Sequence, residues 1–158
     1  MVFLVVEAAM RIAVIDGQGG GIGRVIVEKL RRVLPEAEIL ALGTNAVATA
    51  TMLRAGASEG ATGENAVLFN AGRVDLIVGS LAVVVPHGFL GELTPAMAAA
   101  VGASPAPKIL LPLNRANIEV VGVLPEPLPH LVDMLVGRVQ QFCAAAAGAP
   151  TEGIPAGI

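Results

Sequence analysis

The sequence predicts an α/β protein, a single domain of three layers in which helices cover both faces of a doubly wound, mostly parallel sheet. Short apolar runs typical of buried strands alternate with segments whose apolar residues recur at helical spacing. The first such run, residues 11–16, passes directly into five glycines and then into a helical pattern. The 158 residues suit one domain, and 54% hydrophobic residues supply its core.

The elements of the N-terminal half follow from apolar spacing and from residues that cap or end helices. Apolar residues recur at helical spacing from Ile22 to Pro35, which a helix cannot continue through. Asn45 is expected to cap the next helix and Gly56 to end it. The predicted strands cover residues 11–16, 38–42 and 74–78, and the predicted helices cover residues 22–34, 46–55 and 64–71.

The next segments are less regular. Residues 81–85 are too apolar for an exposed loop and are interpreted either as a further strand or as a packing segment without a helix. Pro95 stands at the first turn of an alanine-rich helix over residues 96–101. Residues 108–113 form a strand, which Pro112 either places at an edge or ends.

The C-terminal part is predicted to close the fold. Residues 118–123 read as a last strand at the edge, antiparallel because its connection to the previous strand is so short. A helical stripe of apolar residues from Leu128 to Phe142 predicts a long closing helix. We therefore expect an upstream extension over residues 1–9, a nucleotide-binding-like domain over residues 10–147, and a flexible Gly/Pro-rich tail over residues 148–158.

Composition narrows the classes of partner. Charged residues make up 15% of the chain, against about 25% in an average protein, so part of the surface is expected to be buried in a homo-oligomer. The net charge of −3 and the lack of Trp and Tyr indicate neither a nucleic-acid surface nor a basic membrane patch. Cys143 is the single cysteine, which excludes an internal disulfide and favours a cytoplasmic protein.

The glycine cluster predicts a turn that holds phosphate. A strand that turns tightly into a helix presents backbone N–H groups and the positive end of the helix dipole at one point. Glycines allow left-handed backbone angles and let a pyrophosphate approach the main chain. The alternative, which the sequence leaves open, is that they only let the helix pack closely on the strand. The cluster consists of Gly17, Gly19, Gly20, Gly21 and Gly23.

Glycine spacing separates the known versions of this turn. The pattern G-x-G-x-x-G fails because Ile22 stands where its last glycine belongs. The pattern G-x-x-x-x-G-K-[ST] fails because Gln18 replaces its first glycine, and because Arg24 and Val25 replace its lysine and hydroxyl residue. Neither of these two phosphate-binding signatures is therefore present.

The pattern G-x-x-x-G-x-G does fit, as Gly17, Gly21 and Gly23. It resembles the Rossmann-like cofactor turn of the short-chain dehydrogenase/reductase family, over the first strand, turn and helix only. The chain has no tyrosine, so that family's Tyr-x-x-x-Lys pair is missing. The acidic residue expected after the second strand, to hold a ribose hydroxyl, is missing too, because residues 43–45 are Gly-Thr-Asn.

A second resemblance extends over residues 10–135. The segments MRIAVIDGQGGGIG, ALGTNAVAT, GATGENA, LGELTP and KILLPLNRANIEVVGV are similar to a small bacterial family known only as a domain of unknown function. Its members begin at the position of Met10, which implies that residues 1–9 are an extension. The resemblance implies no catalytic residues.

Polar residues after the predicted strands are expected to share one crevice, because ligands of open parallel sheets gather beyond the strands' C-terminal ends. Arg115 could make a forked contact with a phosphate or carboxylate, or else a surface salt bridge. Asp16 would repel a phosphate unless a cation intervenes or its carboxylate turns toward the turn's own N–H groups. The predicted binding residues are Asp16, Gly17, Gln18, Gly19, Gly20, Gly21, Ile22, Gly23, Thr44, Asn45, Gly79, Ser80, Asn114 and Arg115.

No catalytic residue and no metal ligand is assigned. Glu64 is interpreted as a helix-start residue that faces the dipole rather than as an acid or base. His87 and His130 lack partners at metal-ligand spacing. Ser80 is not in a G-x-S-x-G elbow.

The predicted partner is a small phosphate-bearing ligand, with NAD(P) favoured slightly over adenine mononucleotides, and enzyme activity left open. One alternative is a non-enzymatic oligomeric regulator or interaction protein whose turn stays empty. Another is a small enzyme that acts on a phosphorylated or acidic metabolite through Arg115 and Glu64.

Overall fold

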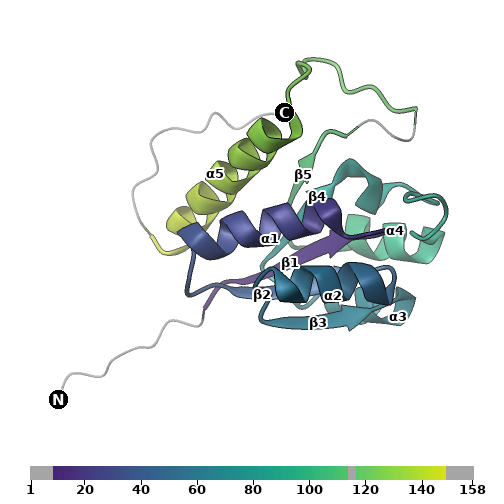
Figure 1. The fold of residues 1–158 in the computed structure, drawn as a ribbon, viewed down its shortest axis with the longest axis horizontal. Helices are drawn as coiled ribbons and strands as arrows, with labels where there is room; N and C mark the ends of the chain where they lie inside the picture. Colours follow the sequence, from purple (N-terminus) through teal and green to yellow (C-terminus); the bar gives the residue numbers. More distant parts are fainter. Residues whose placement is uncertain (1–8, 114–116, 149–158) are drawn as a thin grey trace.

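The computed structural model describes residues 9–113 and 117–148 and contains a five-stranded sheet. The strand order is β3-β2-β1-β4-β5, and every neighbouring pair is parallel. This confirms the predicted doubly wound α/β fold (Figure 1). The strands are β1 (Arg11–Asp16), β2 (Glu38–Gly43), β3 (Glu59–Thr62), β4 (Leu76–Ser80) and β5 (Lys108–Leu111).

Helices cover both faces of the sheet. Buried side chains form two hydrophobic clusters, one on each face of the sheet, and each cluster includes residues of three helices. On the first face lie α1 (Gly21–Val33), α2 (Ala46–Arg54) and α5 (Leu128–Ala146); on the second lie α3 (Glu64–Asn70), the short 3₁₀ helix η1 (Leu81–Val84) and α4 (Pro95–Ala103).

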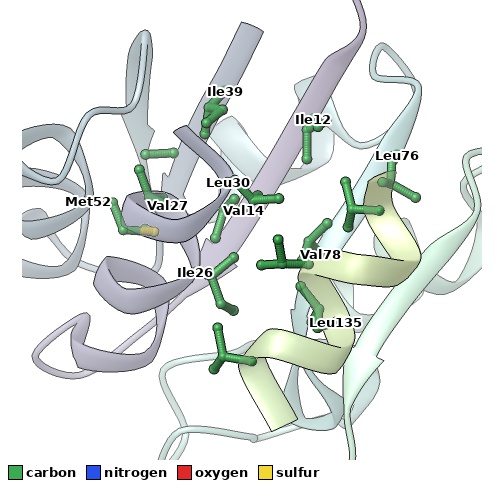
Figure 2. Packing of buried hydrophobic residues seen from close by; sticks show 14 of the residues in the cluster. Ile12, Val14, Ile26, Val27, Leu30, Ile39, Met52, Leu76, Val78 and Leu135 are labelled. Carbon is green, nitrogen blue, oxygen red and sulfur yellow. The ribbon is translucent and has the colours of Figure 1, made fainter. Parts of the chain in front are cut away.

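Strand β1 is the centre of the core, because its side chains alternate between the two clusters. Ile12 and Val14 belong to the cluster under α1 and α5, whereas Ala13 and Ile15 belong to the other, and all four are almost completely buried. Figure 2 shows the first cluster, in which side chains of α1 and α5 meet those of the strands. The glycine turn therefore starts from a central strand whose last five residues are buried.

Three sequence expectations are wrong in detail. Residues 118–123 form no strand, so the described sheet has no antiparallel edge. Gly122 is left-handed in a turn and Val121 is 96% exposed, so this run does not pair with a neighbouring strand among the described residues. Residues 81–84 are a 3₁₀ helix rather than a strand or a helix-free segment. Strand β3, which is mostly exposed, was not expected, because its residues Glu-Gly-Ala-Thr show no apolar pattern.

The topology fixes where a ligand would lie. The chain moves outward from β1 to β2 and β3, then returns across the sheet to β4 and β5, so the direction reverses between β1 and β4. Crevices in such sheets lie beyond the C-terminal ends of the strands at this reversal. Asp16 and Ser80 are the last residues of those two strands. No helix in the described part of the chain is long and apolar enough to cross a membrane.

Candidate functional site

Asp16 shapes the turn between β1 and α1, which we call the glycine turn (residues 17–23). Its carboxylate is 4% exposed and accepts hydrogen bonds from the backbone N–H groups of Gly17, at 2.8 Å, and Gly23, at 2.7 Å. Gly23 is the third residue of α1, so Asp16 satisfies an N–H group that the helix cannot pair internally. Of the two arrangements expected for Asp16, the structure contains the one in which the carboxylate faces the turn itself.

Three amides of the glycine turn point elsewhere. The N–H of Gly20 is bonded to Gly17, but those of Gly19, Gly21 and Ile22 donate to no described residue. Gly21 and Ile22 begin α1, where the partial positive charge of the helix dipole is concentrated. The turn therefore keeps three hydrogen-bond donors for a ligand.

A cavity of about 530 Å³ opens in front of these donors. This volume falls in the range of pockets that hold small molecules, roughly 300–1,000 Å³. We call it the turn cavity. Its wall consists of the first part of the glycine turn, the ends of two strands and an apolar side: Asp16, Gly17, Gln18, Gly19, Gly20, Gly21, Ile22, Ser80, Ala82, Phe89, Leu90 and Leu113.

Ser80 adds a side-chain donor to the same wall. The residue is 4% exposed, and its hydroxyl has no hydrogen-bond partner among the described residues. Since no described side-chain oxygen is both fully buried and without a partner, this hydroxyl must open onto the cavity. Val78, two residues earlier in β4, packs under α1, so Ser80 points to the same face as the start of that helix.

The glycines of the turn divide into two groups. A Cβ at Gly20 would lie 2.8 Å from the main chain of Ala48, and one at Gly23 would lie 2.5 Å from the sulfur of Met52, so packing requires both. Gly20 is also left-handed, with φ 72°. By contrast, a Cβ at Gly19 or Gly21 would meet nothing within 4 Å. Both of these border the turn cavity, so the missing side chains leave room there.

The end of β2 is occupied by a carboxylate that the sequence analysis missed. Glu92 accepts hydrogen bonds at one oxygen from the hydroxyl of Thr44, at 2.8 Å, the amide of Asn45, at 2.5 Å, and the N–H of Gln18, at 3.1 Å. Asn45 also donates to the carbonyl of Gln18, so both main-chain polar groups of Gln18 are hydrogen-bonded. Glu92 comes from the connection between η1 and α4, so no spacing around β2 could have revealed it.

Two opposing effects act on Glu92. Burial raises the pKa of the carboxyl group, but the hydrogen bonds from Asn45, Thr44 and Gln18 together outweigh it, so the pKa lies below its ordinary value. Glu92 is therefore ionised at neutral pH and accepts the N–H of Gln18, whose backbone is left-handed with φ 52°.

The predicted site residues separate into three sets. Residues 16–22, with Ser80, border one cavity, whereas Gly23 is not among its lining residues and packs against Met52. Thr44 and Asn45 lie beside the turn but face Glu92, and a Cβ at Gly79 would lie 2.8 Å from the carbonyl oxygen of Ile15, which is a packing requirement. Asn114 and Arg115 lie outside the described residues, so their part in the site stays a prediction.

Other candidates keep the roles that the sequence favoured. Glu64 is the exposed first residue of α3. The side chain of His130 is 57% exposed, and its Nδ1 lies 2.6 Å from a carboxylate oxygen of Glu126, which precedes α5. Phe89, Leu90 and Leu113 were not predicted to belong to the site; two apolar residues between glycines at 88 and 91 are the signal that could have drawn attention to Phe89 and Leu90.

Comparison with known proteins places the chain in a family. No curated protein matches it. A solved structure that is similar is a dodecameric FMN-dependent UbiX-like decarboxylase from Escherichia coli O157:H7, with 14% identity, a TM-score of 0.41, and coverage of 94% of this chain and 100% of that one. The model of the domain of unknown function DUF3842 matches residues 11–144, most of the chain. The protein is a member of the DUF3842 family.

Proposed function

We propose that this protein binds a small phosphate ester, with the phosphate at the start of α1 and the rest of the ligand in the turn cavity. The observation that carries the proposal is the meeting around one cavity of four donors that have no partner among the described residues, namely the N–H groups of Gly19, Gly21 and Ile22 and the hydroxyl of Ser80. Phosphate oxygens accept several hydrogen bonds at once, and backbone amides at a helix start suit them.

The apolar part of the wall favours an ester over inorganic phosphate. Phe89, Leu90 and Leu113 line the turn cavity together with the donors. Typical ligand pockets combine such apolar surfaces with a few polar groups that fix orientation. A nucleotide has both a charged phosphate for the donors and a flat ring system for the apolar wall. The proposal concerns binding and assigns no reaction.

Ligand-induced thermal stabilisation tests the proposal. The panel is AMP, FMN, nicotinamide mononucleotide, NAD⁺, NADP⁺, glucose 6-phosphate and inorganic phosphate. A ligand at 100 times its Kd adds about 2.7 kcal/mol to the free energy of unfolding, which for a chain of this size raises Tm by about 5–10 °C. If no phosphate compound shifts Tm at millimolar concentration, the proposal is wrong.

Three variants locate the binding. Gly21→Ala places a methyl group in front of the amides, and Ser80→Ala removes a hydroxyl that has no partner among residues 9–113 and 117–148. Both should fold with unchanged or slightly higher Tm but bind the ligand about tenfold or more weakly, since a hydrogen bond to a charged group is worth about 1.5–3 kcal/mol. Gly137→Ala, an equally open glycine in α5, is the matched control and should change binding by less than about twofold.

We also propose that the chain forms a homo-oligomer through the segment before α5. Charged residues are scarce, and apolar side chains in this segment are exposed, among them Val121 at 96% and Leu124 at 74%. Large exposed apolar patches usually mark contacts with other proteins.

A further inference from the structure

The connection between η1 and α4 closes the end of β2. Residues 86–92, which we call the β2 cover, are held by hydrogen bonds of their own: the N–H of His87 donates to the carbonyl of Leu93, and that of Gly91 donates to His87. Leu93 is fully buried, so the cover is anchored in the core. From this base Glu92 reaches Thr44 and Asn45 at the end of β2.

The aromatic ring of the cover completes the closure. A Cβ built on Gly17 would lie 2.9 Å from ring carbons of Phe89 and 2.6 Å from the hydroxyl oxygen of Thr44. The ring and the hydroxyl thus pack directly against the first residue of the glycine turn. Little room is left between the turn and the end of β2.

In dinucleotide-binding sheets, the region beyond the end of the second strand binds one half of the ligand. There, the two nucleotide halves lie on opposite sides of the point where strand order reverses, and an acidic residue after the second strand binds the ribose of one half. Here the donors at that position, Thr44 and Asn45, are already bonded to Glu92 of the protein itself. A ribose there would have to displace a charged group that holds three hydrogen bonds.

The turn cavity extends away from β2, toward the ends of β4 and β5. Its described lining contains Ser80 at the end of β4, Ala82 in η1 and Leu113 after β5, while Phe89 and Leu90 of the β2 cover form the wall on the β2 side. None of its described lining residues belongs to β2 or α2. The space available beside the phosphate donors therefore lies between the β2 cover and the ends of β4 and β5.

We infer that the site takes a mononucleotide, with its sugar and ring over β4 and β5, and that the β2 cover excludes dinucleotides such as NAD(P). This rests on the proposed function, because it assumes that the phosphate binds at the glycine turn. Glu92 is then a specificity residue: it does not line the cavity, but it fills the place of the second nucleotide.

Matched ligand pairs test the inference by calorimetry on the full chain. FAD contains FMN, and NAD⁺ contains nicotinamide mononucleotide, each with an added AMP half. In the pair that binds, the mononucleotide should bind at least about tenfold more tightly than its dinucleotide, a difference of about 1.4 kcal/mol. Glu92→Ala should reduce this preference to less than about threefold, whereas Glu92→Gln, which keeps the bulk and an acceptor oxygen, should retain most of it.

The outcomes separate the two proposals. If a dinucleotide binds wild-type protein as tightly as its mononucleotide, the inference is overturned while phosphate binding at the turn stands. If no compound of either pair binds and the phosphate-ester panel is also negative, the proposed function fails and the inference with it. Far-UV circular dichroism of Glu92→Ala shows whether it is folded; should it unfold, the wild-type ratio and the retained preference of Glu92→Gln still decide.

Discussion

Replacing Asp16 by Asn tests how the glycine turn is held. The carboxylate accepts two backbone N–H groups at 2.8 and 2.7 Å, and the residue is 4% exposed, so both bonds are largely shielded from water. Asn has one acceptor oxygen and presents an NH₂ group where the second oxygen was, so one N–H faces another donor. Hydrogen bonds to charged groups contribute about 1.5–3 kcal/mol and an unsatisfied buried amide costs about 1–3 kcal/mol, so we expect a loss of about 2–4 kcal/mol.

Urea denaturation followed by circular dichroism measures this loss. With a slope of about 2 kcal/mol per M, the midpoint should fall by about 1–2 M. Glu36→Gln, which neutralises an exposed carboxylate, is the control and should leave the midpoint within about 0.3 M. A shift of Asp16→Asn no larger than that of the control would show that the carboxylate does not hold the turn, and the preorganised amides would lose their explanation.

Three further predictions concern packing, pH and assembly. Gly23→Ala should lose about 1–3 kcal/mol of stability, because the new methyl meets Met52 in a fully buried site; urea midpoints equal to those of Gly21→Ala would contradict the packing role. The pKa of Glu92 is lower in the folded state than in the unfolded state. The ionised carboxylate therefore contributes fully to stability above the unfolded pKa of about 4.3. This contribution is lost as pH falls through the lower folded pKa. Thermal melts between pH 3 and 6 should therefore show a smaller acid loss for Glu92→Gln than for wild type, and parallel curves would refute this. Light scattering should give wild-type protein a mass above that of one chain and the Val121→Asp variant a lower mass, whereas a monomeric wild type would exclude the oligomer.

Most of the fold was predictable because it follows from local patterns. Strand β1 has the bounds that its apolar run predicts, and Asn45 caps α2 by accepting the N–H of Ala48. The failures occur where neighbours decide the structure. The apolar run at residues 118–123 resembles a strand but pairs with no described strand, while β3 resembles a loop but becomes a strand because it pairs with β2.

Only one part of the site, the glycine turn with Ser80, was predictable from the sequence. Residues on the turn and Ser80 follow directly from strand ends, so the rule for parallel sheets finds them. The closure of the β2 end depends on Glu92, which is 47 positions from Asn45. Sequence shows that an acidic residue is missing after β2, but only the tertiary structure shows that another element supplies a carboxylate there.

The two readings of the glycine cluster, phosphate binding and close packing, turn out to concern different glycines. Packing accounts for Gly20 and Gly23 but not for Gly21, where alanine at the start of α1 would be accommodated and would favour the helix by up to about 1 kcal/mol. An open glycine does not by itself indicate a ligand, because Gly102 and Gly137 are equally open in other helices. What distinguishes Gly21 is its place on a cavity that also receives the unpaired hydroxyl of Ser80 from a different strand. Close packing of α1 on β1 gives no reason for a hydroxyl that opens onto this cavity and has no partner among the described residues, and a bound phosphate does.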